Sequence, residues 1–481
     1  MKTSTLVIIQ DFMQKLQSSF VTLISVFFFW GFVAASNGIL IPLFKEKFFL
    51  SQFQSQLVDL AFYAAYAIGS LIYFFASRAI GDPIDKIGYK NALILGLLVS
   101  AVGSLLFIPA AGFNSYPFLL GALFIIGLGF ALQQIVANPF VINFGEKESG
   151  AQRLNLAGGI NSFGTTIGPV ILSYALFGNI NGPAPAESSL DEVKLPALIL
   201  FLLFILCAAI LWFSKLPAVG LSEKLDKDLG ALKFPQLRLG MLAIFIYVGV
   251  EVTIQSNMGA LLAMPEIKGL DHSKISHFIS LYWGSLMIGR WTGSLEIFKL
   301  RKNMKRLLQV LVPLLGFALI FGINYLRGSN VSDYLFYIPY VLLASAIFIF
   351  SGENPARSLL ILSLTAAVMM IIGLVSTGNL ALYSFLSGGL FCSVMWPCIF
   401  ALAISGLGKY TNQGSALLVM MILGGAIIPP LQGLLADALD AHQSYFITVF
   451  CFAYLAWYAY KLPVIFKKQG ITWGSASSAG H

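Results

Sequence analysis

The sequence predicts an all-α polytopic membrane protein, and three observations support this fold class. Hydrophobic residues make up 58% of the 481 residues and charged residues only 10%, whereas a soluble domain carries about 25% charged residues. Apolar runs recur along the chain, and many reach the roughly 20 residues that a helix needs to cross a bilayer. The alternating ten-residue segments typical of a membrane β-barrel are missing from the sequence, so we expect helical spans.

Charged residues and Pro/Gly breaks divide the apolar sequence into about fourteen expected spans. A polar loop at 215–237 separates the first six from the last eight. We therefore divide the chain into a first helix bundle at 1–214, this loop as a cytoplasmic connection, a second bundle at 238–468 and a tail at 469–481. The expected spans are 18–43, 55–79, 91–111, 116–143, 154–178, 194–214, 238–264, 273–298, 306–326, 333–351, 357–377, 380–407, 412–437 and 443–464.

The basic residues predict the orientation of these spans. Most of the 29 Lys and Arg residues fall in loops on one side, as at Lys86, Lys90, Lys224 and Arg301. Cytoplasmic loops carry an excess of Lys and Arg, so both termini are expected in the cytoplasm. The net charge of +8 is therefore a topology signal, and we expect no nucleic-acid partner.

The two bundles show weak internal similarity. INSFGTTIGPVI (160–171) and MMILGGAIIPPL (420–431) both run from small residues into an Ile-x-Pro sequence. Duplicated halves with helices interrupted at Gly and Pro are typical of secondary transporters, whose site lies near the bilayer midplane between the halves.

Several strings resemble a known transporter family. The loop GDPIDKIGYK (81–90) resembles the loop motif of the major facilitator superfamily. GLGFALQQIVANPF (127–140), RLNLAGGINSFGTTIGP (153–169) and the segment 393–430 are similar to its fucose–galactose–glucose:cation symporters, and the similarity covers nearly the whole chain. The resemblance implies alternating access, a core of two six-helix bundles with a central sugar site, and a monomer in a bacterial inner membrane.

The loop motif also suggests a gating residue. A carboxylate at Asp85 can cap or pair with a neighbouring helix end, while Lys86 and Lys90 stay in the cytoplasm. Such a contact would hold the inner gate shut in one state of the transport cycle. We therefore expect Asp85 to act in gating.

The chain departs from the family in two ways. The fucose:proton symporters carry an Asp and a Glu at positions that align with Gly38 and Gln134 here, so the family's proton route cannot be transferred to this chain. The segment 306–351 also lies between helices that the family places next to each other. We interpret it as an inserted pair of helices, which gives about fourteen spans and leaves the orientation of the following spans unchanged.

Three charged residues lie inside expected spans, where a charge costs about 2.5–3.5 kcal/mol on insertion scales and is usually functional. Glu251 and Asp59 are the candidates for coupling, because a carboxylate can bind H⁺ or ligate Na⁺. Arg290 is expected to pair with a carboxylate or with helix-end carbonyls and to act in the inner gate. The sequence suggests no other metal site and no bound cofactor.

Neutral amides and an aromatic ring are the expected sugar-binding groups. An amide offers a donor and an acceptor to sugar hydroxyls, and an aromatic face packs against the apolar side of the ring. Each amide can instead be a hydrogen bond between helices, which remains the alternative for every one of them. The candidates are Asn37, Gln134, Asn138, Asn161, Gln255, Gln432 and Trp396.

Together these features predict symport of a hexose-type sugar with H⁺ or Na⁺ across the cytoplasmic membrane, with the sugar and membrane lipid as partners. An uncoupled facilitator and an amino-sugar transporter, of the N-acetylglucosamine type, remain alternatives. Motifs of integral-membrane enzymes, such as GxSxG, HExxH or a Walker lysine, are missing from the sequence. The sequence leaves open which sugar and which cation are carried, and what the added helices do.

Overall fold

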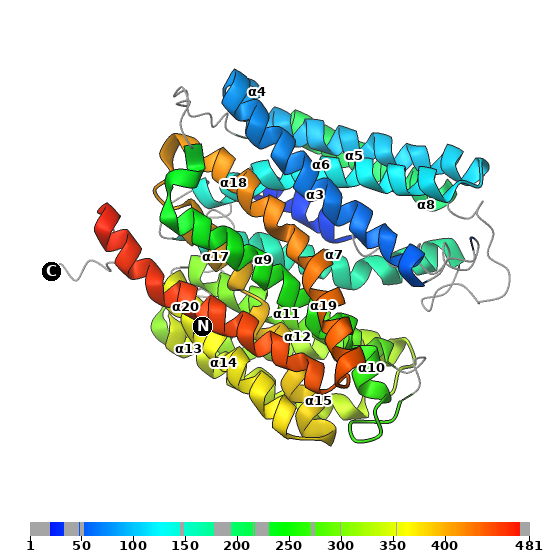
Figure 1. Cartoon of the computed structure of the whole chain (residues 1–481), viewed down its shortest axis with the longest axis vertical. Coiled ribbons are helices and arrows are strands. Elements are labelled where there is room, and N and C mark those ends of the chain that lie inside the picture. The colour runs from blue at the N-terminus through cyan, green and yellow to red at the C-terminus, as the bar shows by residue number, and fades with distance from the viewer. Residues whose placement is uncertain are drawn as a thin grey trace, which may run out of the picture.

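The apolar runs form helices throughout the computed structural model, which describes residues 20–32, 48, 52–144, 149–177, 194–214, 216, 230–270, 275–298, 300–352 and 354–471. In the first half the helices are Phe20–Phe32, α3 (Gln52–Ile80), the short α4 (Pro83–Ile87), α5 (Tyr89–Gly112), α6 (Tyr116–Asn143), α7 (Gly150–Phe177) and α8 (Lys194–Phe213). Figure 1 shows these blue-to-cyan helices packed together on one side of the molecule.

The second half contains several interrupted helices. It runs through η3 (Gly230–Lys233), α9 (Pro235–Ser256), α10 (Met258–Ala263), α11 (Ser276–Ser294), η5 (Leu295–Ile297), α12 (Lys302–Leu326), η6 (Ser332–Tyr337), α13 (Ile338–Ser351) and α14 (Pro355–Val375). One span is divided into α15 (Gly378–Leu386), α16 (Gly388–Cys392) and α17 (Met395–Ile404). The next comprises η7 (Gly408–Tyr410), α18 (Thr411–Met420), η8 (Met421–Leu423) and α19 (Gly424–Ala438), before η9 (Gln443–Tyr445) and α20 (Phe446–Gln469).

These helices confirm an all-α membrane fold. Within the described residues, 11 helical stretches are long and apolar enough to cross a membrane. The shorter helix Phe20–Phe32, α7 and α11 lie where three further spans are expected. Helices α7 and α11 pack against each other across the two halves, which explains why they are richer in Gly and polar residues than helices that face lipid.

The two halves repeat one packing pattern. In the first half α5 packs along α6 and α8, and in the second half α14 packs along α15, α17 and α20. Between the halves, α7 meets α11 and α3 meets α18, and Figure 1 shows the orange α18 lying across the first half. If α12 and α13 are set aside, equivalent helices of the two halves make equivalent contacts, as expected for halves related by rotation about the membrane normal.

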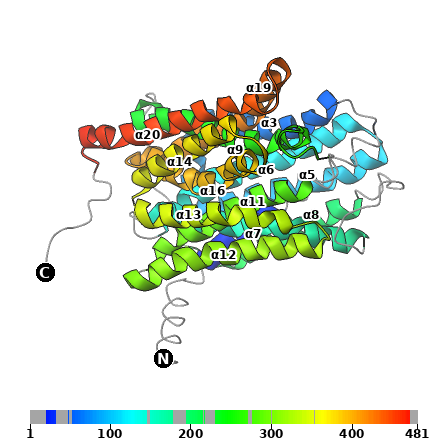
Figure 2. The ribbon, with the colours of Figure 1, turned by 90° about the horizontal axis from the view of Figure 1, so that it is seen from below.

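Helices α12 and α13 lie at the edge of the second half, where α12 packs along α11 (Figure 2). The buried positions of α12 follow the spacing of one helix face; they are Gln309, Pro313, Gly316, Phe317, Ile320 and Asn324. The opposite face exposes apolar side chains, as is expected of a lipid-facing helix. This packing supports the interpretation of α12 and α13 as an added pair of helices. That the pair is an insertion, and where the two bundles begin and end, remain predictions.

We call one end of the molecule the linker end, because η3 follows the connection between the halves there. The last residue of α20, Gln469, hydrogen-bonds Gln236 at the start of α9 (2.9 Å), which places the end of α20 beside η3. Lys90 from the start of α5 donates to the carbonyls of Trp212 and Ser214, both at 2.7 Å. A cation at the C-terminal end of α8 is electrostatically favourable. The predicted orientation makes this end cytoplasmic.

Candidate functional site

The centre of the candidate site is Arg290, on α11 where the two halves meet. Its Nη1 donates to the Ser162 hydroxyl (2.8 Å) and to the Gly158 carbonyl (3.4 Å) of α7, in the first half. Its Nη2 lies 3.5 Å from Oε1 of Glu251 on α9, in the second half. The two charged side chains are only 14% and 12% exposed. Arg290 therefore joins three helices and both halves through one guanidinium group.

Arg290 also contacts a carbonyl that a proline leaves without a partner in its helix. Its Nε donates to the carbonyl of Ser393 (3.0 Å), between α16 and α17. In a helix that carbonyl would accept from the residue four positions on, which is Pro397 and has no N–H group. The break between α16 and α17 thus exposes a carbonyl, and an unsatisfied carbonyl is costly in a membrane interior. Arg290 supplies the missing donor.

Two tyrosines position Glu251. The Tyr247 hydroxyl donates to Oε1 of Glu251 (2.7 Å), one helical turn away on the same face of α9. The Tyr282 hydroxyl, from α11, donates to the backbone carbonyl of Glu251 (2.7 Å). The carboxylate therefore accepts from a hydroxyl and faces a guanidinium, an arrangement that fixes its orientation.

Trp396 lies near Tyr247, the residue that donates to Glu251. Its ring centroid is 6.3 Å from that of Tyr247 and 5.7 Å from that of Phe400, and its side chain is only partly buried in an otherwise buried helix. The helix break that frees the Ser393 carbonyl is thus followed by an aromatic side chain near Tyr247, the hydrogen-bond donor to Glu251. Of the candidates chosen from sequence, the structure brings Glu251 and Arg290 into direct contact, and Trp396 approaches this pair through Tyr247.

The amide candidates occupy different places. Gln134 on α6 donates to the Tyr66 hydroxyl of α3 (3.0 Å), and both residues belong to the first half. Asn161 on α7, next to Ser162, donates to the Phe27 carbonyl (3.0 Å), which is the interhelical role that remained its alternative. Asn138 is 2% exposed, so it packs in the core of α6 rather than lining an open surface.

The remaining amides lie toward the end opposite the linker. Gln432 is fully buried and its Oε1 accepts from Asn257 (2.6 Å), at the break between α9 and α10. Gln255 is one turn beyond Glu251 and partly buried. Two candidates cannot be placed: Asn37 and the side chain of Asp59 lie outside the described residues.

A polar cluster joins the halves at the linker end. Asp82 caps α4 by accepting from the Ile84 amide (2.9 Å), and it also accepts from the Tyr73 hydroxyl. Asn412 at the start of α18 donates to Oδ2 of Asp82 (2.9 Å) and approaches Oδ1 of Asp85 at 3.5 Å. Of the two carboxylates, Asp82 is therefore the closer partner of Asn412.

This ranking gives a prediction for the loop. Asp82→Asn should slow the transport cycle more than Asp85→Asn, because Asp82 is the closer acceptor of the cross-half bond from Asn412 and also caps α4. A hydrogen bond to a charged group contributes about 1.5–3 kcal/mol, against about 1 kcal/mol for a neutral one. Initial uptake rates of the two variants in one vesicle preparation test this order, and a larger effect of Asp85→Asn would reverse the assignment.

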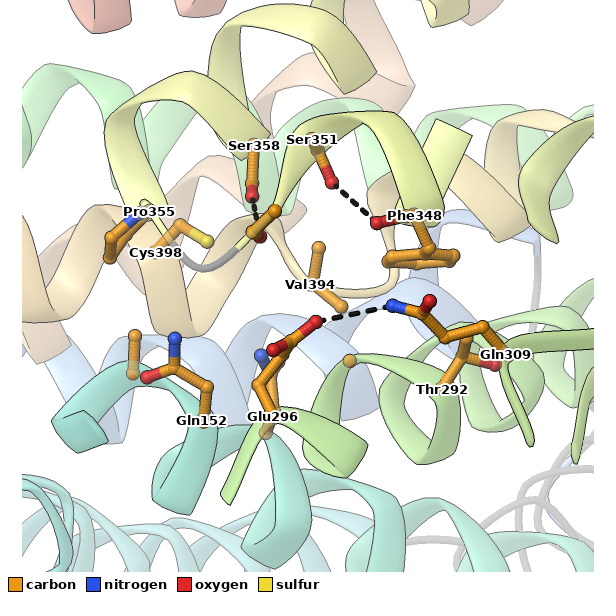
Figure 3. A pocket seen from close by; sticks show the side chains of 14 residues that line it. Gln152, Thr292, Glu296, Gln309, Phe348, Ser351, Pro355, Ser358, Val394 and Cys398 are labelled. Atoms are coloured by element: carbon orange, nitrogen blue, oxygen red, sulfur yellow. Dashed lines mark hydrogen bonds between the residues drawn. The ribbon is translucent and has the colours of Figure 1, made fainter. Parts of the chain in front are cut away.

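A small cavity of about 30 Å³ lies near the linker end, between α7, α11, α12, α13, α14 and α17 (Figure 3). Its carboxylate, Glu296, forms an ion pair with Lys305 and accepts from Gln309 (3.1 Å). Ligand pockets usually measure about 300–1,000 Å³, and this volume holds about one water molecule. In this conformation the cavity is therefore too small to hold a hexose.

Some residues of the site were not singled out from sequence. Tyr247 lies four positions before Glu251, so helical spacing could have indicated it. Asp82 precedes Pro83, and Asp followed by Pro is a signal for a helix start. Ser162, Tyr66 and Asn412 carry no such local signal, because their roles depend on contacts between helices far apart in sequence.

The comparisons with known proteins agree with this architecture. The model of the Major Facilitator Superfamily matches residues 19–357. The chain belongs to the Major Facilitator Superfamily. A glucose/galactose transporter of Brucella abortus is 35% identical over 443 residues, covering 90% of this chain and 91% of that protein. The L-fucose-proton symporter of Escherichia coli is 28% identical over 459 residues and 90% of both chains.

The solved structures extend this result to the fold. The superfamily transporter FucP in its outward conformation has a TM-score of 0.73 and 27% identity, covering 93% of this chain and 99% of that one. Together with the named relatives, this places the chain in the fucose–galactose–glucose:cation symporter family of the Major Facilitator Superfamily. The protein is a multi-pass membrane transporter and not an enzyme.

Proposed function

We propose that this superfamily member carries a hexose-type sugar together with H⁺ or Na⁺ across a bacterial inner membrane, by alternating access and as a monomer. The observation that carries the proposal is the buried pair of Glu251 and Arg290 between the halves, with the partly buried Trp396 near Tyr247, which donates to Glu251. The relatives named as glucose/galactose and fucose transporters support the sugar class. The linker end, with the termini, faces the cytoplasm in this proposal.

The pair suggests how coupling works. Arg290 contacts α7 of the first half and Glu251 of the second, so the charge state of Glu251 affects a contact between the bodies that must move. A cation on Glu251 weakens its attraction for Arg290, which frees Nη2 of the guanidinium for sugar hydroxyls. Coupling then requires that the doubly loaded and empty states change conformation more readily than the singly loaded ones.

An uncoupled facilitator is the second candidate. It is favoured by Gly38 and Gln134, which cannot ionise at the two positions where the fucose:proton symporters carry acids. The amino-sugar alternative concerns the same site and differs only in the substrate. Both alternatives share the alternating-access mechanism and the sugar-binding groups.

One experiment separates these proposals. The protein is reconstituted in liposomes, and uptake of labelled glucose, galactose, fucose and N-acetylglucosamine is measured under an imposed pH gradient and, separately, an imposed Na⁺ gradient. Accumulation above equilibrium under one gradient supports symport and identifies the ion. Equilibration without accumulation under either gradient supports the facilitator, and the absence of uptake of all four sugars would contradict the proposed substrate class.

The aromatic contact gives a prediction for affinity. Trp396→Ala should raise the sugar concentration for half-maximal uptake by roughly 2- to 13-fold, because stacking on an aromatic ring is expected to contribute about 0.5–1.5 kcal/mol. Trp396→Phe keeps an aromatic face and should change it by less than about threefold. Concentration-dependent uptake measures both, with Phe400→Leu as a neighbouring control. An unchanged half-saturation in Trp396→Ala would place the sugar elsewhere.

A further inference from the structure

A second proline in the chain frees a carbonyl at the linker end. Pro139 lies inside α6, so the carbonyl of Ile135, four residues earlier, has no N–H partner within its own helix. The Ser415 hydroxyl of α18 donates to this carbonyl at a distance of 2.7 Å, in a fully buried position. The bond crosses from the second half to the first.

The first turn of α18 is held in place around this bond. Gln413 donates to the Ser77 hydroxyl of α3 (2.9 Å), and its Oε1 accepts from the Ala231 amide of η3 (3.2 Å). The first half, through Ser77, and η3, which follows the connection between the halves, therefore both hydrogen-bond to the same turn of α18. Residues 411–415 are all buried, so the turn sits between the halves rather than in open solvent.

The chemistry of the two partners makes the bond reversible. When the halves separate, the Ser415 hydroxyl can donate to the carbonyl four residues earlier in its own helix, as Ser side chains commonly do. The Ile135 carbonyl would then face the water that enters an opened cavity, and water can satisfy it. If the Ile135 carbonyl already accepted a hydrogen bond within α6, a second bond from Ser415 would stabilise the contact between the halves only slightly. Pro139 removes that helical bond, so the bond from Ser415 contributes more.

We propose that Ser415 and the Pro139-freed carbonyl of Ile135 form a latch that favours the state closed at the linker end. The latch sets the balance between the two states of alternating access and takes no part in sugar or cation binding. The proposal rests on the alternating-access part of the proposed function and not on the substrate. The latch can therefore be disproved while the sugar assignment stands, and the sugar assignment can be disproved while the latch stands.

The test measures the conformational balance directly and without sugar. Nitroxide labels are attached to cysteines at Ile87→Cys on α4 and Lys467→Cys on α20, both exposed at the linker end. The four native cysteines are buried, which favours labelling of the introduced pair. Pulsed electron paramagnetic resonance then gives the populations of short and long distances.

Ser415→Ala should raise the ratio of long to short distances about threefold to tenfold, the effect of one net hydrogen bond. The matched control is Ser345→Ala on α13, a buried Ser whose hydroxyl donates to the Val341 carbonyl of its own helix (3.1 Å). This control should leave the ratio unchanged.

A second variant separates the latch from a local packing defect. Pro139→Ala restores an N–H that bonds the Ile135 carbonyl, so it should shift the ratio in the same direction. In that background Ser415→Ala should have less than about half of its effect in the native chain, because coupled residues are not additive. An unchanged ratio in Ser415→Ala, or its full effect in the Pro139→Ala background, would overturn the proposal.

Discussion

Glu251→Gln is expected to abolish accumulation of sugar above equilibrium while leaving sugar exchange across the membrane intact. Glutamine has nearly the same shape, and its side-chain oxygen can still accept from Tyr247 and from Arg290. It cannot bind a proton and brings no negative charge to a Na⁺ ion. The variant therefore removes the coupling chemistry and keeps the shape of the side chain, while Arg290 retains the acceptors of Ser162, Gly158 and Ser393.

The size of the effect follows from the coupling free energy. Coupling between two ligands is typically about 1–3 kcal/mol, which corresponds to roughly 5- to 150-fold in affinity. We expect the accumulation ratio under the driving gradient to fall to about one, while the rate of counterflow, with sugar on both sides, stays within about threefold of the native rate. Both are measured on the same proteoliposomes.

Two controls determine which acid is responsible. Tyr247→Phe removes the hydroxyl that donates to Glu251 but keeps the carboxylate, so accumulation should weaken and persist. Asp59→Asn removes the second intramembrane acid predicted from sequence. Accumulation that survives in Glu251→Gln but is lost in Asp59→Asn would transfer the coupling role to Asp59 and leave Glu251 as a structural partner of Arg290.

The sequence was sufficient for much of the fold because apolar periodicity is local. The expected spans at 116–143 and 194–214 agree with α6 and α8 to within a residue, and the basic residues Lys86 and Lys90 lie together at one end. The interruptions of the longer spans were not predicted as separate helices. They depend on how a proline or a small residue is accommodated by neighbouring helices, as at Pro397 beside Arg290.

The candidate site was predicted as single residues rather than as contacts. The cost of burying charge singled out Glu251 and Arg290, but nothing local in the sequence indicates that α9 and α11 bring them within 3.5 Å. The same limit explains the gate: sequence favoured Asp85 by resemblance, whereas Asn412, from a distant helix, bonds more closely to Asp82. Proline is an exception to this limit. Each proline inside a helix predicts that the carbonyl four residues earlier needs a hydrogen-bond donor from elsewhere.

Arg290→Met is expected to cause the largest loss of stability among single substitutions at the site. Removing one partner of a buried ion pair typically costs about 3–5 kcal/mol, because the other charge is left without compensation. The variant also takes the donor away from the Ser393 carbonyl. Arg290→Lys should recover only part of the loss, since an ammonium is a point charge and cannot reach α7, α9 and the α16–α17 break together.

The double variant Arg290→Met with Glu251→Gln tests whether this loss comes from the unpaired carboxylate. Replacing both charges removes the uncompensated carboxylate, so the double variant should unfold at a temperature between those of the native protein and Arg290→Met, with a coupling of about 1–3 kcal/mol. Thermal unfolding of the purified proteins, followed by tryptophan fluorescence, gives this order.

If Arg290→Met unfolded at the native temperature, the guanidinium would not be holding the halves together. If the double variant unfolded below Arg290→Met, Glu251 would stabilise the fold through Tyr247 rather than through the ion pair. A double variant that is folded but transports without accumulation would assign the pair to coupling, separately from its part in stability.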